Sequence, residues 1–201
     1  MRSTGLLRRL ALVAVVAAST AGCAVAYKTD LLRKDVLTDA QQAIAEMKLD
    51  HGDMTIAGSA DRADTTYAPG QPITLSVKTS KNAYVAILRV TANGDTTIVF
   101  PNRERRNAAV RAGTALTVPG PGDNVKIAAD KPGVMLFEFI ASTAGDAWPF
   151  TRPPDSGSDF ADLGGTTRNI TKDLLAGLKI GAGSDIAASH LTVRIAGRGL
   201  F

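Results

Sequence analysis

The sequence has few of the residues on which catalytic and metal sites usually depend. It contains one cysteine, Cys23, and two histidines, His51 and His190. One cysteine cannot form an intramolecular disulfide, and these three residues do not supply the three or four ligands of a zinc site. A serine hydrolase needs Ser, His and an acid in mutual contact, and the G-x-S-x-G motif is absent. We therefore predict no catalytic residue, no metal and no cofactor.

Long hydrophobic runs are also missing. The apolar stretch near the N-terminus, residues 10–18, is too short to span a bilayer, which takes roughly 20 apolar residues. It follows Arg2, Arg8 and Arg9 and precedes small residues at 19–22, which is the order of a secretory signal. We predict that residues 1–22 are a signal peptide removed on export. A retained N-terminal anchor is the alternative.

The exported chain has little net charge. Removing three of the 23 basic residues with the signal leaves 20 basic against 19 acidic residues. Nonspecific binding to nucleic acid depends on many uncompensated Lys and Arg contacts to phosphates. We therefore expect no nucleic-acid partner.

Cys23 follows Thr20-Ala21-Gly22, where the signal peptide should end. This segment resembles a bacterial lipobox, in which small residues precede a cysteine that is diacylated and becomes the mature N-terminus; Thr20 stands where Leu is usual. The resemblance implies a lipoprotein, held by a palmitate-type lipid in the outer membrane because Ala24 is not acidic. The alternative is cleavage after Ala24-Val25-Ala26, which would leave a soluble periplasmic or secreted protein.

Two periodicities divide the rest of the chain. Apolar residues from Asp30 to about Lys48 recur at helical spacing, so residues 23–52 should hold the lipid-anchor site and an amphipathic helix. From residue 54 the pattern alternates. It predicts strands near 54–58, 72–79, 82–91, 95–100, 114–118, 124–128 and 134–141. Residues 84–90 and 134–140 are apolar on both faces apart from Arg89 and Glu138, so we expect these two strands to be central. Pro101 cannot donate to a ladder, so it should end its strand at Phe100.

Turn residues connect these strands. Asn93-Gly94 is typical of a type I′ hairpin turn, and Pro69-Gly70 suits the centre of a type II turn. A long loop at 145–165, a helix at 166–178 and a closing strand at 190–196 follow. We predict one domain at 53–201, mainly β, as an antiparallel β-sandwich of about seven or eight strands. The N-terminal helix and one C-terminal helix complete the fold.

Two loops carry candidate binding residues. Arg103, Arg105 and Arg106 form the densest basic cluster of the exported chain, although Glu104 partly neutralises it, and a local basic patch can bind anions. Trp148, Phe150 and Arg152 lie in a Pro-rich segment, and aromatic side chains on loops often bind sugars or proteins. The alternative for the arginines is a solvated loop, and the alternative for the aromatic segment is a loop anchor packed against the edge of the sandwich.

Asp155, Asp159 and Asp162 could bind calcium, but without EF-hand spacing we interpret them as solvated acids.

The central stretch resembles a bacterial envelope family described as a domain of unknown function, DUF4384-like. The resemblance rests on several short segments in order: Tyr67-Ala68-Pro69-Gly70-Gln71-Pro72-Ile73, Ala83-Tyr84-Val85-Ala86-Ile87-Leu88, Asn93-Gly94, Val99-Phe100-Pro101-Asn102, Arg111-Ala112-Gly113, Val118-Pro119 and Pro132-Gly133. It implies a domain found in lipoproteins and beside kinase-like or caspase-like enzymes, with no assigned catalytic residues. The segment after Gly145 departs from the family pattern.

Together these features predict a non-catalytic exported lipoprotein. It would bind or scaffold another envelope component, a protein or a polymer, and contact the membrane through its N-terminal lipid. A carbohydrate- or peptidoglycan-binding module is the first alternative, because of the aromatic loop. A hydrolase that uses His51 or His190 is the second.

Overall fold

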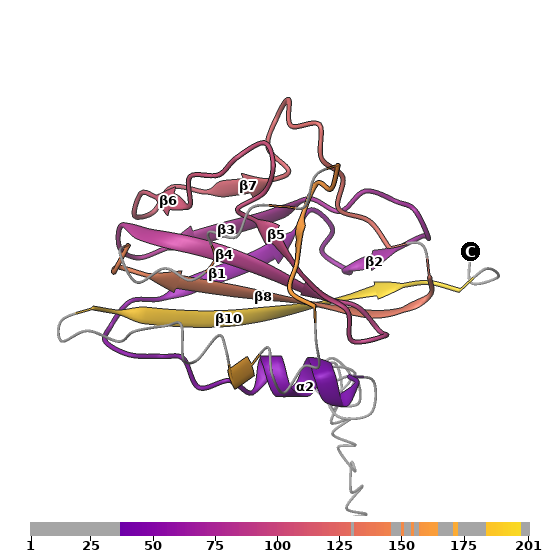
Figure 1. The fold of residues 1–201 in the computed structure, drawn as a ribbon, viewed down its shortest axis with the longest axis horizontal. Coiled ribbons are helices and arrows are strands. Elements are labelled where there is room, and N and C mark those ends of the chain that lie inside the picture. Colours follow the sequence, from indigo (N-terminus) through magenta and orange to yellow (C-terminus); the bar gives the residue numbers. More distant parts are fainter. Residues whose placement is uncertain are drawn as a thin grey trace, which may run out of the picture. The chain divides into compact units, whose positions relative to one another are not determined.

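The computed structural model of the chain describes residues 37–129, 131–145, 150, 154, 157–164, 171–172 and 184–197. Ten strands and the helix α2 have their bounds within these ranges (Figure 1). They are α2 (Asp39–Ala45), β1 (Ile56–Ala60), β2 (Thr66–Tyr67), β3 (Leu75–Thr79), β4 (Ala83–Val90), β5 (Thr96–Phe100), β6 (Ala109–Val110), β7 (Leu116–Val118), β8 (Gly133–Ser142), β9 (Ala161–Asp162) and β10 (Ile186–Ile195). The mainly β class is confirmed.

The strands form two sheets. The smaller has the order β1-β3-β7, and the larger has the order β2-β10-β8-β4-β5-β9, with β6 paired to β4. All of these pairings are antiparallel except the short one between β2 and β10, which is parallel. The prediction of a purely antiparallel fold is therefore wrong at that edge, where β2 contributes only two residues.

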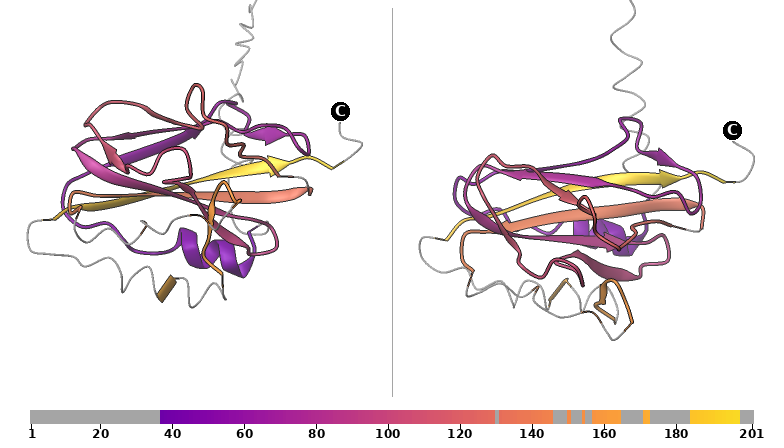
Figure 2. Two further views of the ribbon diagram at one scale, coloured as in Figure 1. Left: turned by 45° about the horizontal axis from the view of Figure 1, so that its top comes forward. Right: turned by 90° about the horizontal axis from the view of Figure 1, so that it is seen from above.

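Both faces of the larger sheet are buried. On one face, a hydrophobic cluster joins it to the smaller sheet through residues such as Val77, Phe137 and Phe139. On the other, Ile44 of α2 and Ile140 of β8 belong to a second cluster. Figure 2 shows the sheets as layers with α2 against the larger one. Each large side chain buried in this way contributes about 1.5–3 kcal/mol.

The two strands with the longest apolar runs lie side by side. β4 and β8 were expected to be central because they are apolar on both faces, and they pair along seven residues from Tyr84↔Ser142 to Val90↔Leu136. The prediction is confirmed. Arg89 and Glu138, the two charged exceptions, lie on opposite faces, because Arg89 follows Val85 and Ile87 at steps of two whereas Glu138 pairs with Leu88.

The helix α2 is shorter than predicted. Its N-terminus is a capping box, in which the Thr38 hydroxyl accepts from Gln41 N and the Gln41 side chain accepts from Thr38 N. The expected end at Lys48 is wrong, because the chain leaves the helix after Ala45 and buries Leu49. Residues 30–36 of the predicted helix lie outside the described part of the chain.

One predicted turn is confirmed and the other is corrected. Gln71 N donates to Ala68 O and Gly70 has φ +76°, as a type II turn around Pro69-Gly70 requires. The Asn93-Gly94 turn is not type I′, because only Gly94 has positive φ. Gly94 N donates to Thr91 O and Thr91 N to Asp95 O, so the hairpin has a five-residue loop.

The predicted strand at 124–128 does not form, although its alternation is correct. Val125 and Ile127 are buried, and Ile127 O accepts from Ile73 N over 2.9 Å. The neighbouring Pro72 has no N–H to donate, so this pairing cannot continue as a ladder.

The C-terminal part differs from the prediction in extent. The closing strand predicted at 190–196 is confirmed as β10, which begins four residues earlier, at Ile186, and lies between β8 and β2 in the larger sheet. The expected loop at 145–165 contains β9, which pairs with β5. Of the helix predicted at 166–178 only Thr171 and Lys172 are described, and both are helical.

Candidate ligand-binding pocket

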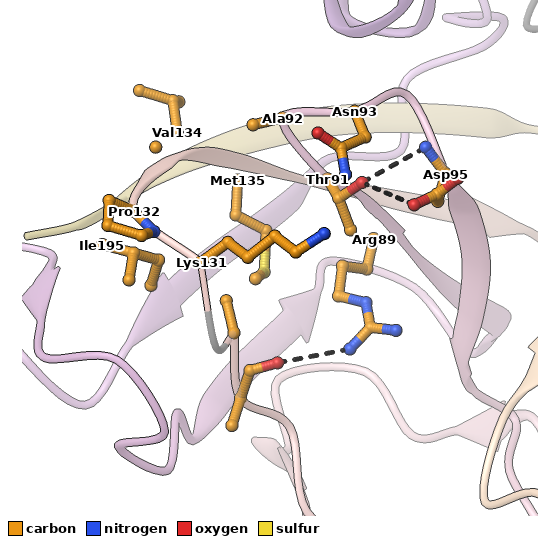
Figure 3. Close-up of a pocket in the computed structure, with 13 residues that line it drawn as sticks. Arg89, Thr91, Ala92, Asn93, Asp95, Lys131, Pro132, Val134, Met135 and Ile195 are labelled. Carbon is orange, nitrogen blue, oxygen red and sulfur yellow. Dashed lines mark hydrogen bonds between the residues drawn. The ribbon is translucent and has the colours of Figure 1, made fainter. Parts of the chain in front are cut away.

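A pocket of about 370 Å³ lies at one end of the larger sheet (Figure 3). It is formed where β4 ends in the loop 91–95, where β8 begins and where β10 ends. Its apolar wall includes Met135 and Ile195. The charged residues among the described part of its lining are Arg89, Asp95 and Lys131. The pocket therefore combines an apolar wall with charged groups, as ligand sites commonly do.

Arg89 is the charged residue that the fold positions most firmly. It is half-buried, and its Nε donates to the hydroxyl of Thr97, the residue opposite it on β5, over 3.0 Å. Nη1 contacts Ala128 O at 3.5 Å, and the guanidinium lies 5.7 Å from the centre of the Phe160 ring. These contacts hold the side chain in one orientation at the pocket.

Arg89 has no carboxylate within ion-pair distance among the residues that the structure describes. Burial lowers the pKa of its guanidinium, while the more distant charges of Asp162 and Asp95 oppose that shift. An arginine nevertheless stays protonated in proteins. A half-buried positive charge without a paired carboxylate is favourable when a ligand supplies the negative charge.

Lys131 adds a second positive charge at the rim. It is exposed, and in Figure 3 its side chain reaches across the pocket towards Arg89 and Thr91. Asp95 supplies one negative charge, and its Oδ2 accepts from the Thr91 hydroxyl over 3.4 Å. Two positive and one negative side chain leave the described lining with one net positive charge. The pocket is therefore suited to an anion.

The predicted basic cluster is largely neutralised by acids of its own chain. Arg103 Nη2 lies 2.9 Å from Asp159 Oδ1. Arg105 Nε lies 3.0 Å from Asp123 Oδ2 in an ion pair whose angle falls short of a hydrogen bond. Arg105 also donates to Thr117 O. Arg103 and Arg105 therefore have partners within the chain, whereas Arg106 is exposed. The predicted binding roles of all three stay predictions.

The loop that carries these arginines is organised by Asn102. This side chain is 1 % exposed; its amide donates to Val99 O, and its Oδ1 accepts from the backbone N–H groups of Glu104 and Arg105. Sequence reasoning expected Pro101 to end β5 at Phe100, which is confirmed. It did not anticipate that Asn102 would be buried as the centre of the turn.

The aromatic loop is only partly described. Phe150 is 1 % exposed and belongs to the hydrophobic cluster beside α2, so it packs inside the fold and offers no surface ring. Trp148 and Arg152 lie outside the described residues. For Phe150 the anchor interpretation is therefore favoured over direct binding.

The candidate calcium ligands have separate local roles. Asp159 pairs with Arg103, while Asp162 Oδ1 accepts from Gly164 N over 3.0 Å. Asp155 is not among the described residues. Within the described ranges, no group of three or more His, Cys, Asp or Glu is placed to hold a metal ion.

Of the two histidines, His51 pairs with the start of β10 and His190 lies within β10. The backbone of His51 pairs with Ile186 through two hydrogen bonds of 2.8 Å. His190 is exposed and is the cross-strand partner of Glu138.

Glu138 is 2 % exposed, and burial raises its pKa to about 8, with a smaller contribution from Asp50. Its Oε2 has no hydrogen-bond partner in the described structure.

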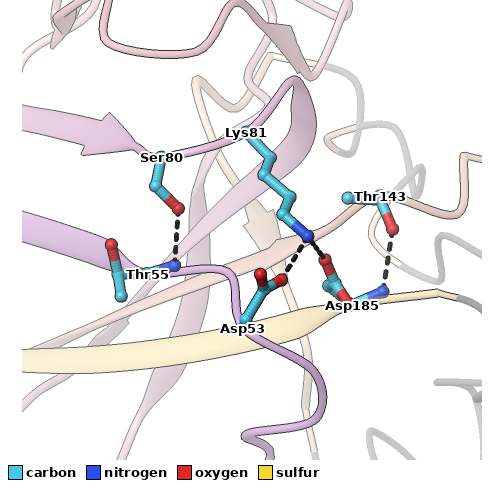
Figure 4. A network of polar contacts seen from close by, with 6 residues as sticks. All are labelled: Asp53, Thr55, Ser80, Lys81, Thr143 and Asp185. Carbon is cyan, nitrogen blue, oxygen red and sulfur yellow. Dashed lines mark hydrogen bonds and ion pairs between the residues drawn. The ribbon is translucent and has the colours of Figure 1, made fainter.

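A polar network joins four segments that are distant along the chain (Figure 4). Lys81 contacts the carboxylates of Asp53 and Asp185, and Thr143 Oγ1 accepts from Asp185 N over 2.8 Å. Hydrogen bonds to Asp185 and Asp53 raise the pKa of Lys81, while the bond from Lys81 lowers that of Asp53. Because Lys81 and Asp53 are well exposed, we assign this network to strand alignment and not to ligand binding.

Sequence reasoning missed the pocket itself. Arg89 was recognisable as a charge within an otherwise apolar strand, and that was a usable signal. Lys131 and Asp95 gave no such signal, because each lies in an ordinary polar turn. The β4–β5 hairpin places Asp95 in the pocket lining, and the pairing of β8 with β4 places Lys131 there. Cys23 and the predicted signal peptide lie outside the described residues.

Two layers of mainly antiparallel strands with a pocket at one end define a β-rich domain. Residues 66–144 match DUF4384, a domain of unknown function. The resemblance to this family is thus confirmed, and the matched segment runs from β2 to the end of β8. No curated protein and no solved structure gives a significant match. Within the described residues, no helix is long and apolar enough to cross a membrane.

Proposed function

We propose that this chain is a non-catalytic lipoprotein exported to the bacterial envelope, where it binds or scaffolds another envelope component at the Arg89 pocket. One observation carries the proposal: a half-buried arginine, held by Thr97 and Phe160, faces a pocket without a carboxylate partner among the described residues. The signal-like segment 1–22 and Cys23 support export and lipid anchoring.

The fold supports binding at one end of a rigid scaffold. We infer that the two sheets form a β-sandwich, because they share one hydrophobic cluster. This cluster contains residues from all six described strands of five or more residues, which are β1, β3, β4, β5, β8 and β10. Such sandwiches commonly bind their ligands with the loops at one end. The pocket, built from the loop 91–95 and the start of β8, occupies a place of this kind.

Site-directed photocrosslinking in cells of the native host tests the proposal. A photoreactive residue replaces Asn93, an exposed residue of the pocket lining, and a matched probe replaces Ala109, which is exposed on β6. We expect an adduct with an envelope protein or polymer from position 93 and none from 109. Arg89→Gln should reduce the adduct several-fold. An absent adduct, or one that Arg89→Gln leaves unchanged, would contradict the proposal.

A sugar polymer as partner would be recognised in the same experiment. An adduct that digestion with a peptidoglycan hydrolase removes identifies the carbohydrate-binding alternative, whereas one that a protease removes identifies a protein partner. Cosedimentation of the purified protein with sacculi provides the independent check.

A further inference from the structure

We propose that the Arg89 pocket binds a carboxylate that has an apolar group beside it, either a small organic acid or the C-terminus of a peptide. This inference rests on the proposed function, because it names the ligand class of the same pocket. It is carried by the hydrogen-bond donors of Arg89 that the described contacts leave unused, by the charges of the described lining residues and by the apolar side chains of the opposite wall.

The guanidinium of Arg89 has donors left for a ligand. Arginine carries five N–H groups, and the described structure uses two of them, one to the Thr97 hydroxyl and one to Ala128 O. The remaining donors include both hydrogens of Nη2. A hydrogen on each of the two terminal nitrogens suffices for a bidentate pair with a carboxylate. Phe160 stacks against the guanidinium, so the ligand would approach in the plane of the group.

The charges of the lining favour a single negative charge. Arg89 and Lys131 contribute two positive charges, and Asp95 contributes one negative charge to the same pocket. A phosphate group carries about −1.5 to −2 at neutral pH and would place its additional charge near Asp95. A carboxylate carries one charge, which matches the net charge of the described lining residues. The electrostatics therefore favour a carboxylate over a phosphate.

The opposite wall favours an apolar group next to the carboxylate. Val134 and Met135 at the start of β8 and Ile195 at the end of β10 line the pocket, and burying apolar surface against them contributes about 25 cal/mol per Å². The volume of about 370 Å³ is near the lower end of the range for ligand sites, roughly 300–1,000 Å³. The pocket therefore suits one apolar side chain with its carboxylate.

Calorimetry on the purified full chain tests this inference with matched probes. N-acetyl-leucine represents a peptide C-terminus, and hexanoate represents a free organic acid. N-acetyl-leucinamide has the same shape without the charge. We expect at least one acid to bind about tenfold more tightly than the amide, because only the acid can form the charge-assisted pair with Arg89. Inorganic phosphate should compete weakly.

Three variants identify the site. Arg89→Gln should weaken the acid about tenfold, and Lys131→Ala should weaken it by a smaller factor. Lys131 is exposed, so its variant tests the site even if Arg89→Gln does not fold. Arg106→Ala, an exposed arginine that does not line the pocket, should bind like the wild type.

Several results would overturn the inference. Equal binding of the acid and the amide, stronger binding of phosphate, or loss of binding in Arg106→Ala alone would each exclude the proposed carboxylate site, as would no binding of either acid. If no acid binds while the crosslink from position 93 still depends on Arg89, the ligand class is wrong and the proposed function stands. If that crosslink is also absent, both fail.

Discussion

The ring of Phe139 on β8 occupies the space in which a side chain on Gly58 of β1 would stand. A Cβ atom added at Gly58 would lie 2.2 Å from the Phe139 ring, far inside van der Waals contact. Gly58 belongs to the smaller sheet and Phe139 to the larger one, and Phe139 is fully buried. At this point the two sheets are therefore so close that residue 58 can have no side chain.

We predict that Gly58→Ala destabilises the fold by about 1–3 kcal/mol, the usual cost of overpacking a core. The control is Gly197→Ala, because a Cβ there meets no atom within 4 Å. Both changes reduce the entropy of the unfolded chain similarly, so their difference in the free energy of unfolding in urea reports the packing. Equal stability of the two variants would mean that the sheets do not pack as described.

Gln41 should be more important for stability than its polar character suggests. Its side chain is fully buried, and its amide donates to Val134 O over 2.7 Å and to Val90 O over 3.2 Å. Gln41→Ala would remove both hydrogen bonds that join the helix to β4 and β8, which should cost about 2–3 kcal/mol. Gln42→Ala is the matched control on the same helix, with little expected change. Urea denaturation of both variants measures the difference.

Glu138 should make stability fall as pH rises. Its pKa is raised by burial to about 8 in the folded chain, above the ordinary value of about 4.3 in the unfolded chain. From about pH 4.5 to 8 the folded state holds a proton that the unfolded state releases, so the free energy of unfolding decreases across this window.

The variant Glu138→Gln should remove that decrease and be more stable than the wild type at pH 8, by a few kcal/mol. Glu46→Gln, at an exposed position, should keep the pH dependence of the wild type. The measurement is thermal or urea unfolding at several pH values. A wild-type stability that is flat between pH 5 and 8 would contradict the assignment.

Neighbouring arginines should differ in their effect on stability. Arg105→Ala removes the hydrogen bond to Thr117 O, the ion pair with the well-buried Asp123 carboxylate and the contact with the Phe100 ring. We expect a loss of about 1–2 kcal/mol. Arg106→Ala should stay within about 0.5 kcal/mol. Equal losses would show that the arginines share one role.

The periodic parts of the fold were predictable from the sequence. β4 and β8 are long and apolar on both faces, so their central position followed from pattern alone. β2, β6 and β9 were not predictable, because two residues cannot display an alternation. Pro69-Gly70 indicated its turn correctly, whereas the Asn93-Gly94 hairpin took a five-residue loop that its dipeptide does not encode.

The candidate site could be predicted only in part. The charge of Arg89 in an apolar strand marked one residue, but Lys131 and Asp95 join it through tertiary geometry. The arginine cluster looked basic in the sequence because Asp123 and Asp159, which pair with Arg105 and Arg103, are distant along the chain. Ion pairs of this kind are set by the fold and leave no local pattern.

The account depends most on export, and mass spectrometry of the native N-terminus tests it most directly. We predict a mature chain that begins at Cys23 with a covalent diacylglyceryl group and an N-terminal acyl chain, recovered with membranes. In Cys23→Ala the lipoprotein peptidase should leave the precursor uncut. An intact chain that begins at Met1, without lipid and dissolved in the cytosol, would contradict the proposal that this domain binds its partner in the envelope.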